Sequence, residues 1–186
     1  MVIFDVDGTL LDTSPGILNS VRFAEAQLGL KPADDMTLRK FLGPPPQSMY
    51  KEVYGLSEEE SLRAARAHRR YGMEKAIYEA KVYDGIKELL HTLKDRGIRM
   101  GVATLKLQKI ADTILSHYGL KDYFDVIVGM NESESLTKAD TILMCMRACG
   151  ETTAVMIGDS QYDYKGAVEA GVDFSLELFF EDISSL

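Results

Sequence analysis

The sequence Met1-Val-Ile-Phe-Asp-Val-Asp-Gly-Thr-Leu-Leu-Asp-Thr13 opens the chain and decides its fold. Val2 to Val6 is apolar except for Asp5, and such a run is typical of a strand buried on both faces of a parallel sheet. Asp5 and Asp7 stand where this strand ends, and Gly8 allows a tight turn. Ligands of open α/β sheets bind at the carboxyl ends of the strands, so the two acids are predicted to form part of a site. The alternative is that an aspartate before a glycine is only a turn residue.

Beyond residue 84, helical and extended patterns alternate regularly. Strands are predicted at residues 98–103, 125–128 and 154–157, and helices at 84–97, 107–118 and 138–148. Strands that alternate with helices of this length form βαβ units with right-handed crossovers. The expected fold class is therefore α/β, with a Rossmann-like three-layer αβα core around a parallel sheet.

Residues 15–80 show helical patterns without strand patterns. Ser14 and Pro15 predict the start of a helix, and Ser57 with Glu60 predicts a capping box at the start of another. Three consecutive prolines after Gly43 interrupt the helical pattern, because proline cannot continue a helix. The expected domains are an α/β core at 1–14 and 81–186 and a helical insertion at 15–80.

The composition excludes several classes of protein. With 46% hydrophobic and 27% charged residues, the sequence is typical of a soluble globular protein, and no apolar run approaches the ~18 residues of a membrane span. The net charge of −8, without a basic stripe, argues against a nucleic acid polymer as partner. Met1 leads directly into the first strand and leaves no room for a leader peptide, so a cytoplasmic location is expected.

Polar residues from distant parts of the sequence are predicted to meet at one edge of the sheet. Asp5, Thr104 and Asp159 each follow an apolar strand, and Lys138 starts a helix that leads back to the same edge. Several carboxylates without histidine or cysteine make an oxygen-only site, which suits a hard cation such as Mg²⁺. The sequence therefore predicts a magnesium site with cationic and hydroxyl groups beside it.

The order and identity of these residues resemble the haloacid dehalogenase superfamily of phosphohydrolases. The resemblance rests on Asp5-Val-Asp7-Gly-Thr9, on Thr104, on Lys138 and on the segment from Gly158-Asp159 to Asp163. Lys40-Phe-Leu-Gly-Pro-Pro45 and Val82-Tyr-Asp-Gly85 are similar to the branch that contains phosphoglycolate phosphatases and 5′-nucleotidases. The resemblance implies that the helical insertion is the small cap domain of this superfamily, a mobile cap that closes over the site. The alternative is that its helices simply pack on the sheet.

The resemblance also implies roles for the four acids. Asp5 would be the nucleophile and a ligand of Mg²⁺, and Asp159 would be a second carboxylate ligand. Asp7 would give its backbone carbonyl to the metal, while its side chain protonates the leaving group and later accepts a proton from water. Asp163 would bind a water molecule of the metal or orient Lys138, although it could be only a helix cap.

Other residues are expected to bind the phosphate or the rest of the substrate. Thr104 and the following amide at Leu105 would hold phosphoryl oxygens together with Lys138. Lys106 is a further candidate, which could equally be a surface lysine, and the turn at Gly8 and Thr9 borders the same site. In the insertion, Arg39 and Lys40 precede the loop at 43–47, which is the candidate loop for substrate selection.

The predicted function is Mg²⁺-dependent hydrolysis of small phosphomonoesters, of the phosphoglycolate or nucleoside 5′-monophosphate class, through an aspartyl-phosphate. Dehalogenases and phosphonatases lack an acid at the position of Asp7, so both are disfavoured. A sugar-phosphate mutase of the same fold and a non-catalytic phosphoacceptor or binding protein are the alternatives. The partner would be a small phosphorylated metabolite. The apolar residues near the end of the chain would form an edge strand or an exposed patch in a monomer or a weak homodimer; they are Leu176, Leu178, Phe179 and Phe180.

Overall fold

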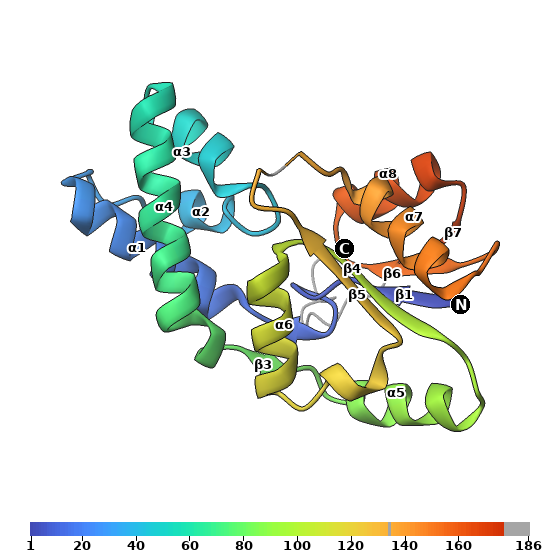
Figure 1. Ribbon diagram of the computed structural model, residues 1–186. Helices are drawn as coiled ribbons and strands as arrows, with labels where there is room; N and C mark the ends of the chain where they lie inside the picture. The colour runs from blue at the N-terminus through green and yellow to red at the C-terminus, as the bar shows by residue number, and fades with distance from the viewer. Residues whose placement is uncertain (134, 177–186) are drawn as a thin grey trace, which may run out of the picture. The chain divides into compact units, whose positions relative to one another are not determined.

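The chain divides into two compact units in the computed structural model, which describes residues 1–133 and 135–176 (Figure 1). The core unit consists of Met1–Asp12 and of the chain from Lys81 onward, and the helical unit consists of Thr13–Ala80. The role of the helical unit as a cap stays a prediction.

A five-stranded parallel sheet lies at the centre of the core unit. Its strands lie in the order β5-β4-β1-β6-β7, so the first strand of the chain is the middle one. Strand β1 pairs with β4 on one side and with β6 on the other, and Phe4 lies level with Val102 and Ile157. The predicted fold class is confirmed. The strand bounds are β1 Val2–Phe4, β4 Met100–Leu107, β5 Val126–Met130, β6 Val155–Gly158 and β7 Asp173–Leu176.

Helices cover both faces of this sheet and give it three layers. Ile3 and Phe4 are fully buried on opposite faces, because successive side chains of a strand alternate. On the face of Ile3, α7 packs on β4 and β5, and α8 packs on β6 and β7. Figure 1 shows α5 and α6 on the other face. The bounds of these helices are α5 Ile86–Asp95, α6 Gln108–His117, α7 Lys138–Cys149 and α8 Gln161–Ala170.

Two smaller elements complete the core unit. Strand β2 (Leu11–Asp12) pairs antiparallel with β3 (Lys81–Val82), which joins the two segments of the chain that make up this unit. A short 3₁₀ helix, η2 (Lys121–Tyr123), precedes β5.

The helical unit has a hydrophobic core of its own. As its sequence predicts, its described residues form no strand, and Ser57 and Glu60 form the expected capping box of α4. Its elements are α1 Ser14–Leu28, α2 Asp35–Arg39, α3 Pro46–Tyr54, α4 Glu58–Glu74 and the 3₁₀ helix η1 Ala76–Tyr78. Helix α4 packs on α1 and α3, around a cluster that contains Val21, Ala24, Leu38, Phe41, Met49, Tyr50 and Ala64.

The structure corrects one strand boundary that bears on the site. The sequence pattern predicts that the second strand of the sheet ends at Ala103, whereas β4 continues through Thr104 to Leu107. Near the other end of the chain, Leu176 is the last residue of β7 and is exposed. Leu178, Phe179 and Phe180 lie outside the described residues. Among the residues that are described, no helix combines the length and the apolar character that crossing a bilayer requires.

Candidate active site

The middle position of β1 brings the predicted site residues of the core unit together. Asp5 follows β1, and the strands on its two sides carry Thr104 in β4 and Asp159 just after β6. The Asp5 amide donates a hydrogen bond to the carbonyl of Ile157, which ties the end of β1 to β6 at an N···O distance of 3.0 Å. The chain also crosses from one side of β1 to the other in this sheet, and ligands of such folds bind at that point.

Three carboxylates converge at this edge. Asp5, Asp159 and Asp163 each offer one oxygen, and these oxygens lie within 4.8 Å of one another. Two glycines leave room for the group. A Cβ at Gly8 would overlap the carboxylate of Asp159, and a Cβ at Gly158 would overlap the side chain of Asp163. The backbone therefore approaches the acids at both positions more closely than any other residue type would allow.

Lys138 lies between two of these acids. Its Nζ is 2.8 Å from Oδ1 of Asp5 and 2.6 Å from Oδ1 of Asp163. Its side chain is 4% exposed, so both ion pairs are shielded from water. Gly166 of α8 makes this possible, because a Cβ there would lie 2.6 Å from Cγ of Lys138. Close packing of α7 on α8 thus fixes the first residue of α7 inside the acidic cluster.

Asp163 has two functions at once, which the sequence presents as alternatives. Its Oδ2 accepts hydrogen bonds from the backbone N–H and the hydroxyl of Ser160, so it completes a capping box at the start of α8. Its Oδ1 faces Lys138. The helix cap therefore orients the carboxylate that holds the lysine. Sequence reasoning missed Ser160, although a serine three residues before an acid is a recognisable capping-box pattern.

Asp7 contacts Lys106 and is not one of the acids of the three-carboxylate group. Its Oδ2 lies 3.0 Å from Nζ of Lys106. Thr104 is buried beside this pair, and its hydroxyl accepts a hydrogen bond from the backbone N–H of Lys106. The buried hydroxyl of Thr9 donates to Oδ1 of Asp159 over 3.4 Å. That the Asp7 side chain does not bind the metal stays a prediction.

The remaining predicted residues contribute backbone or lie in the other unit. Leu105 is part of β4 and is half-buried. Arg39 ends α2 and Lys40 follows it, and both are exposed on the helical unit. Because they belong to that unit, the contact of Arg39 and Lys40 with a substrate stays a prediction.

Burial and crowding raise the pKa of two of the acids. The pKa of Asp5 is raised to about 7, mainly by burial and further by Asp163 and Asp7, although Lys138 opposes this change. The pKa of Asp159 is raised to about 6 by burial and by the same two neighbours. For Lys138, burial favours the neutral amine, but Asp5 and Asp163 outweigh it and raise the pKa. The site thus contains more negative charge than its lysines compensate.

The donors and the charge both fit a divalent cation. The site contains four carboxylates, from Asp5, Asp7, Asp159 and Asp163, and two ammonium groups, from Lys106 and Lys138, so two negative charges remain when all six groups are ionised. A hard cation such as Mg²⁺ binds a few carboxylate oxygens and retains water ligands. Asp5 and Asp159 are the residues whose side chains would hold the cation. The carboxylate of Asp163 lies within 4.8 Å of both.

Gly8 offers a test of how closely the backbone must approach Asp159. We expect Gly8→Ala to lower both thermal stability and any phosphatase activity, because alanine would collide with Asp159 and would also be strained at φ 76°. Gly150→Ala is the matched control, since Gly150 has φ 67° but no heavy atom within 4 Å of the added Cβ. The control should lose only the ~1–2 kcal/mol of stability that the left-handed conformation costs an alanine, and it should retain activity. Equal effects on activity would contradict the close approach.

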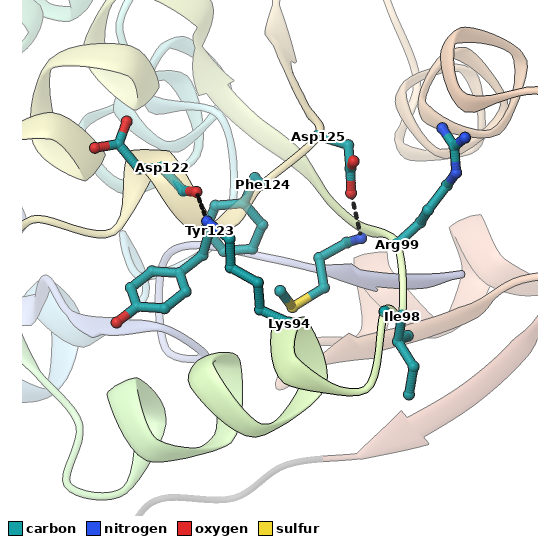
Figure 2. Close-up of a pocket in the computed structure, with 9 residues that line it drawn as sticks. Lys94, Ile98, Arg99, Asp122, Tyr123, Phe124 and Asp125 are labelled. Atoms are coloured by element: carbon teal, nitrogen blue, oxygen red, sulfur yellow. Dashed lines mark hydrogen bonds between the residues drawn. The ribbon is translucent and has the colours of Figure 1, made fainter.

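A hollow of the core unit lies at the opposite edge of the sheet from these acids. Figure 2 shows it beside the start of β4, between the end of α5 and the segment before β5. Two hydrogen bonds cross its lining: Lys94 donates to the carbonyl of Asp122, and the Met100 amide donates to Asp125. Among the described residues, the group of acids that could hold a metal ion lies at the carboxyl edge and not in this hollow, so the carboxyl edge is the candidate active site.

Comparison with known proteins places the chain in a family. The model of the haloacid dehalogenase-like hydrolase family matches residues 2–176. The chain belongs to this family. The resemblance seen in the sequence motifs is thereby confirmed, and with it the expected class of enzyme, a phosphatase of the haloacid dehalogenase family.

Several relatives of this family carry the name of an activity. A 5′-nucleotidase of Pseudomonas aeruginosa is 34% identical over 174 residues, which are 92% of this chain and 79% of that protein. Tyrosine-protein kinase PtkA of Mycobacterium tuberculosis is 35% identical over 181 residues, 93% of this chain but only 60% of its own length. The crystal structure of a predicted phosphatase from Clostridium acetobutylicum has a TM-score of 0.86 and 39% identity, over 93% of this chain and 82% of that one.

Proposed function

We propose that this hydrolase is a Mg²⁺-dependent phosphatase that cleaves small phosphomonoesters through an aspartyl-phosphate on Asp5. The observation that supports it most strongly is the group of Asp5, Asp159 and Asp163 with Lys138 inserted between two of them. Carboxylates around a cation, with a lysine beside them, suit the binding of a phosphoryl group as its charge redistributes.

In the first step, a carboxylate oxygen of Asp5 attacks phosphorus, and the bond from phosphorus to the ester oxygen breaks. The new bond makes an acyl phosphate on Asp5, which divides one difficult hydrolysis into two easier steps. Asp7 protonates the leaving alkoxide, so the alcohol departs neutral. The Thr104 hydroxyl and the Lys138 ammonium hold the phosphoryl oxygens during the transfer.

In the second step, water attacks the phosphorus of the acyl phosphate. Asp7 is now ionised and takes a proton from this water, the bond from phosphorus to Asp5 breaks, and inorganic phosphate forms. Asp7 and Asp5 thereby return to their starting states. When Mg²⁺ is bound, it compensates the repulsion between the carboxylates and the phosphate and polarises the phosphoryl oxygens.

The expected class of substrate is inferred from a named relative and from the sequence motifs. The named 5′-nucleotidase makes nucleoside 5′-monophosphates one candidate class, and the motifs at residues 40–45 and 82–85 add phosphoglycolate. Release of inorganic phosphate from these compounds and from sugar phosphates, with Mg²⁺ or with EDTA, tests the proposal. Mg²⁺-dependent turnover supports it. A mutase would convert sugar phosphates without net phosphate release, and a single stable phosphoryl adduct would indicate a phosphoacceptor.

Magnesium binding can be tested without activity. Because the pKa of Asp5 and of Asp159 is higher in the fold than the ordinary 3.8, these groups make the metal-free protein less stable as the pH rises from about 4 to 7. A cation binds the unprotonated carboxylates, so Mg²⁺ should stabilise the protein more at pH 8 than at pH 5.5. We expect saturating Mg²⁺ to raise the unfolding midpoint by about 5 °C at pH 8.

The matched pair of variants for this measurement is Asp159→Asn and Asp122→Asn. Asp159 is in the carboxylate group, whereas Asp122 is exposed and contributes its backbone carbonyl to a contact with Lys94. The midpoint of Asp159→Asn should respond weakly to Mg²⁺, and that of Asp122→Asn should respond as the wild type does. A shift that is the same in all three proteins would show that the cation binds elsewhere.

A further inference from the structure

Strand β4 contains a bulge at the point where it reaches the site. Ala103 pairs with Val128 and Leu107 pairs with Met130, so three residues of β4 lie opposite a single residue of β5. The three residues are Thr104, Leu105 and Lys106. Bulges change the direction of side chains and are frequent beside active sites. Here the bulge places the buried Thr104 hydroxyl under the Lys106 amide, at 3.2 Å.

Two residues outside the catalytic motifs hold this bulge in place. The Gln108 side chain accepts a hydrogen bond from the Gly129 N–H over 2.6 Å and donates one to the carbonyl of Ile127. It therefore replaces the ladder bonds that the bulge removes from β5. Gly129 lets the strands approach, since a Cβ there would lie 2.7 Å from the Lys106 carbonyl and from the Gln108 backbone.

The consequence of this backbone path is the ion pair between Lys106 and Asp7. The Lys106 side chain is 14% exposed and that of Asp7 is 26% exposed, and their charged atoms are 3.0 Å apart. The contact fixes an Asp7 oxygen on the side of β4, while the three-carboxylate group gathers around Asp5. An acid that must serve the leaving group in one step and water in the next needs such a fixed direction.

We propose that Lys106 is a positioning residue that orients Asp7 for proton transfer, with the Gln108-locked bulge as its support. This inference rests on the proposed phosphatase function. It differs from direct phosphate binding by Lys106, because the ammonium group acts through Asp7. The two roles have different kinetic consequences, since a phosphate contact serves every substrate equally, whereas proton donation serves only leaving groups that need a proton.

The test compares two leaving groups in the wild type, Lys106→Met and Lys106→Arg. p-Nitrophenolate is a stable anion and departs without a proton, whereas the alkoxide of an alkyl phosphate does not. We measure kcat/KM, which reports the first phosphoryl transfer, for p-nitrophenyl phosphate and for an alkyl phosphate that the wild type hydrolyses. Lys106→Met should lower kcat/KM about 30-fold or more for the alkyl phosphate and at most about threefold for p-nitrophenyl phosphate.

Controls separate this inference from the proposed function and from misfolding. Lys106→Arg, which retains a cation, should recover much of the alkyl phosphate activity, and Lys109→Met on the exposed start of α6 should leave both activities unchanged. Gln108→Ala should reproduce the selective loss in a weaker form. Equal losses on both substrates, or no loss, would overturn the positioning role. If the wild type hydrolyses neither substrate with Mg²⁺, the proposed function itself fails, and this inference fails with it.

Discussion

Asp5→Asn is expected to lower kcat for phosphomonoester hydrolysis by about four orders of magnitude or more while the protein stays folded. The neutral amide of asparagine cannot attack phosphorus as a carboxylate does, so the acyl phosphate does not form. The shape of the side chain is preserved, and Lys138 retains its second partner, Asp163. Because burial already raises the pKa of Asp5 to about 7, a neutral group at this position is tolerated by the fold.

Phosphate release with Mg²⁺ and thermal unfolding of the same preparations check this expectation. Asp122→Asn serves again as the control for an exposed acid, and it should retain full turnover. Turnover of Asp5→Asn within about tenfold of the wild type, in a sample free of deamidated protein, would show that another group is the nucleophile. Loss of cooperative unfolding would instead show that Asp5 is needed for the structure.

The sequence predicts the meeting of the acids well because it depends on features that are local in the chain. Apolar runs show where strands end, and parallel strands share one carboxyl edge, so Asp5 and Asp159 had to approach each other if the sheet was parallel. The order of the strands then determines which residues are neighbours. Because β4 and β6 flank β1, Thr104 and Asp159 lie on the two sides of Asp5. The same reasoning identified Lys138, which begins α7 at that edge.

Long-range backbone geometry limits what the sequence predicts about the proton-transfer group. The pair of Lys106 and Asp7 depends on the bulge in β4, and the bulged residues 104–106 include neither glycine nor proline that would indicate it. The two residues that stabilise the bulge, Gln108 and Gly129, are recognisable only after β4 and β5 are paired. The sequence prediction ended this strand before Thr104. It therefore named Lys106 as a candidate but did not predict its ion pair with Asp7.

Asp163 shows a second limit of prediction from sequence, which concerns the role of a single residue. Sequence patterns assign one role to one residue, so helix cap and active-site acid appear as alternatives. A carboxylate has two oxygens, and here Oδ2 accepts from Ser160 while Oδ1 faces Lys138. Dual use of one side chain follows from atomic geometry, and it explains why the start of α8 is both a structural and a chemical part of the site.

Lys138→Met is expected to have the largest effect on stability of any substitution considered, in addition to loss of turnover. Lys138 is buried between Asp5 and Asp163, and methionine would fill a similar volume without compensating their charge. Removing one partner of a buried ion pair typically costs about 3–5 kcal/mol. In EDTA, the unfolding free energy of the variant at pH 8 should therefore fall by about this amount.

The pH dependence of this loss identifies its cause. Burial raises the pKa of Asp5 and Lys138 opposes this change, so without the lysine the pKa of Asp5 should rise further and the variant should recover stability as the pH falls from 8 toward 5. The triple variant Asp5→Asn, Lys138→Met, Asp163→Asn has no charge at these positions, and it should be more stable at pH 8 than Lys138→Met alone, because neutral groups replace unpaired buried charges. Denaturant unfolding of the three proteins in EDTA measures both effects. A Lys138→Met protein that is as stable as the wild type at pH 8 would contradict this account. It would mean that the Lys138 ammonium group contributes only to catalysis and is not required to hold Asp5 and Asp163 together.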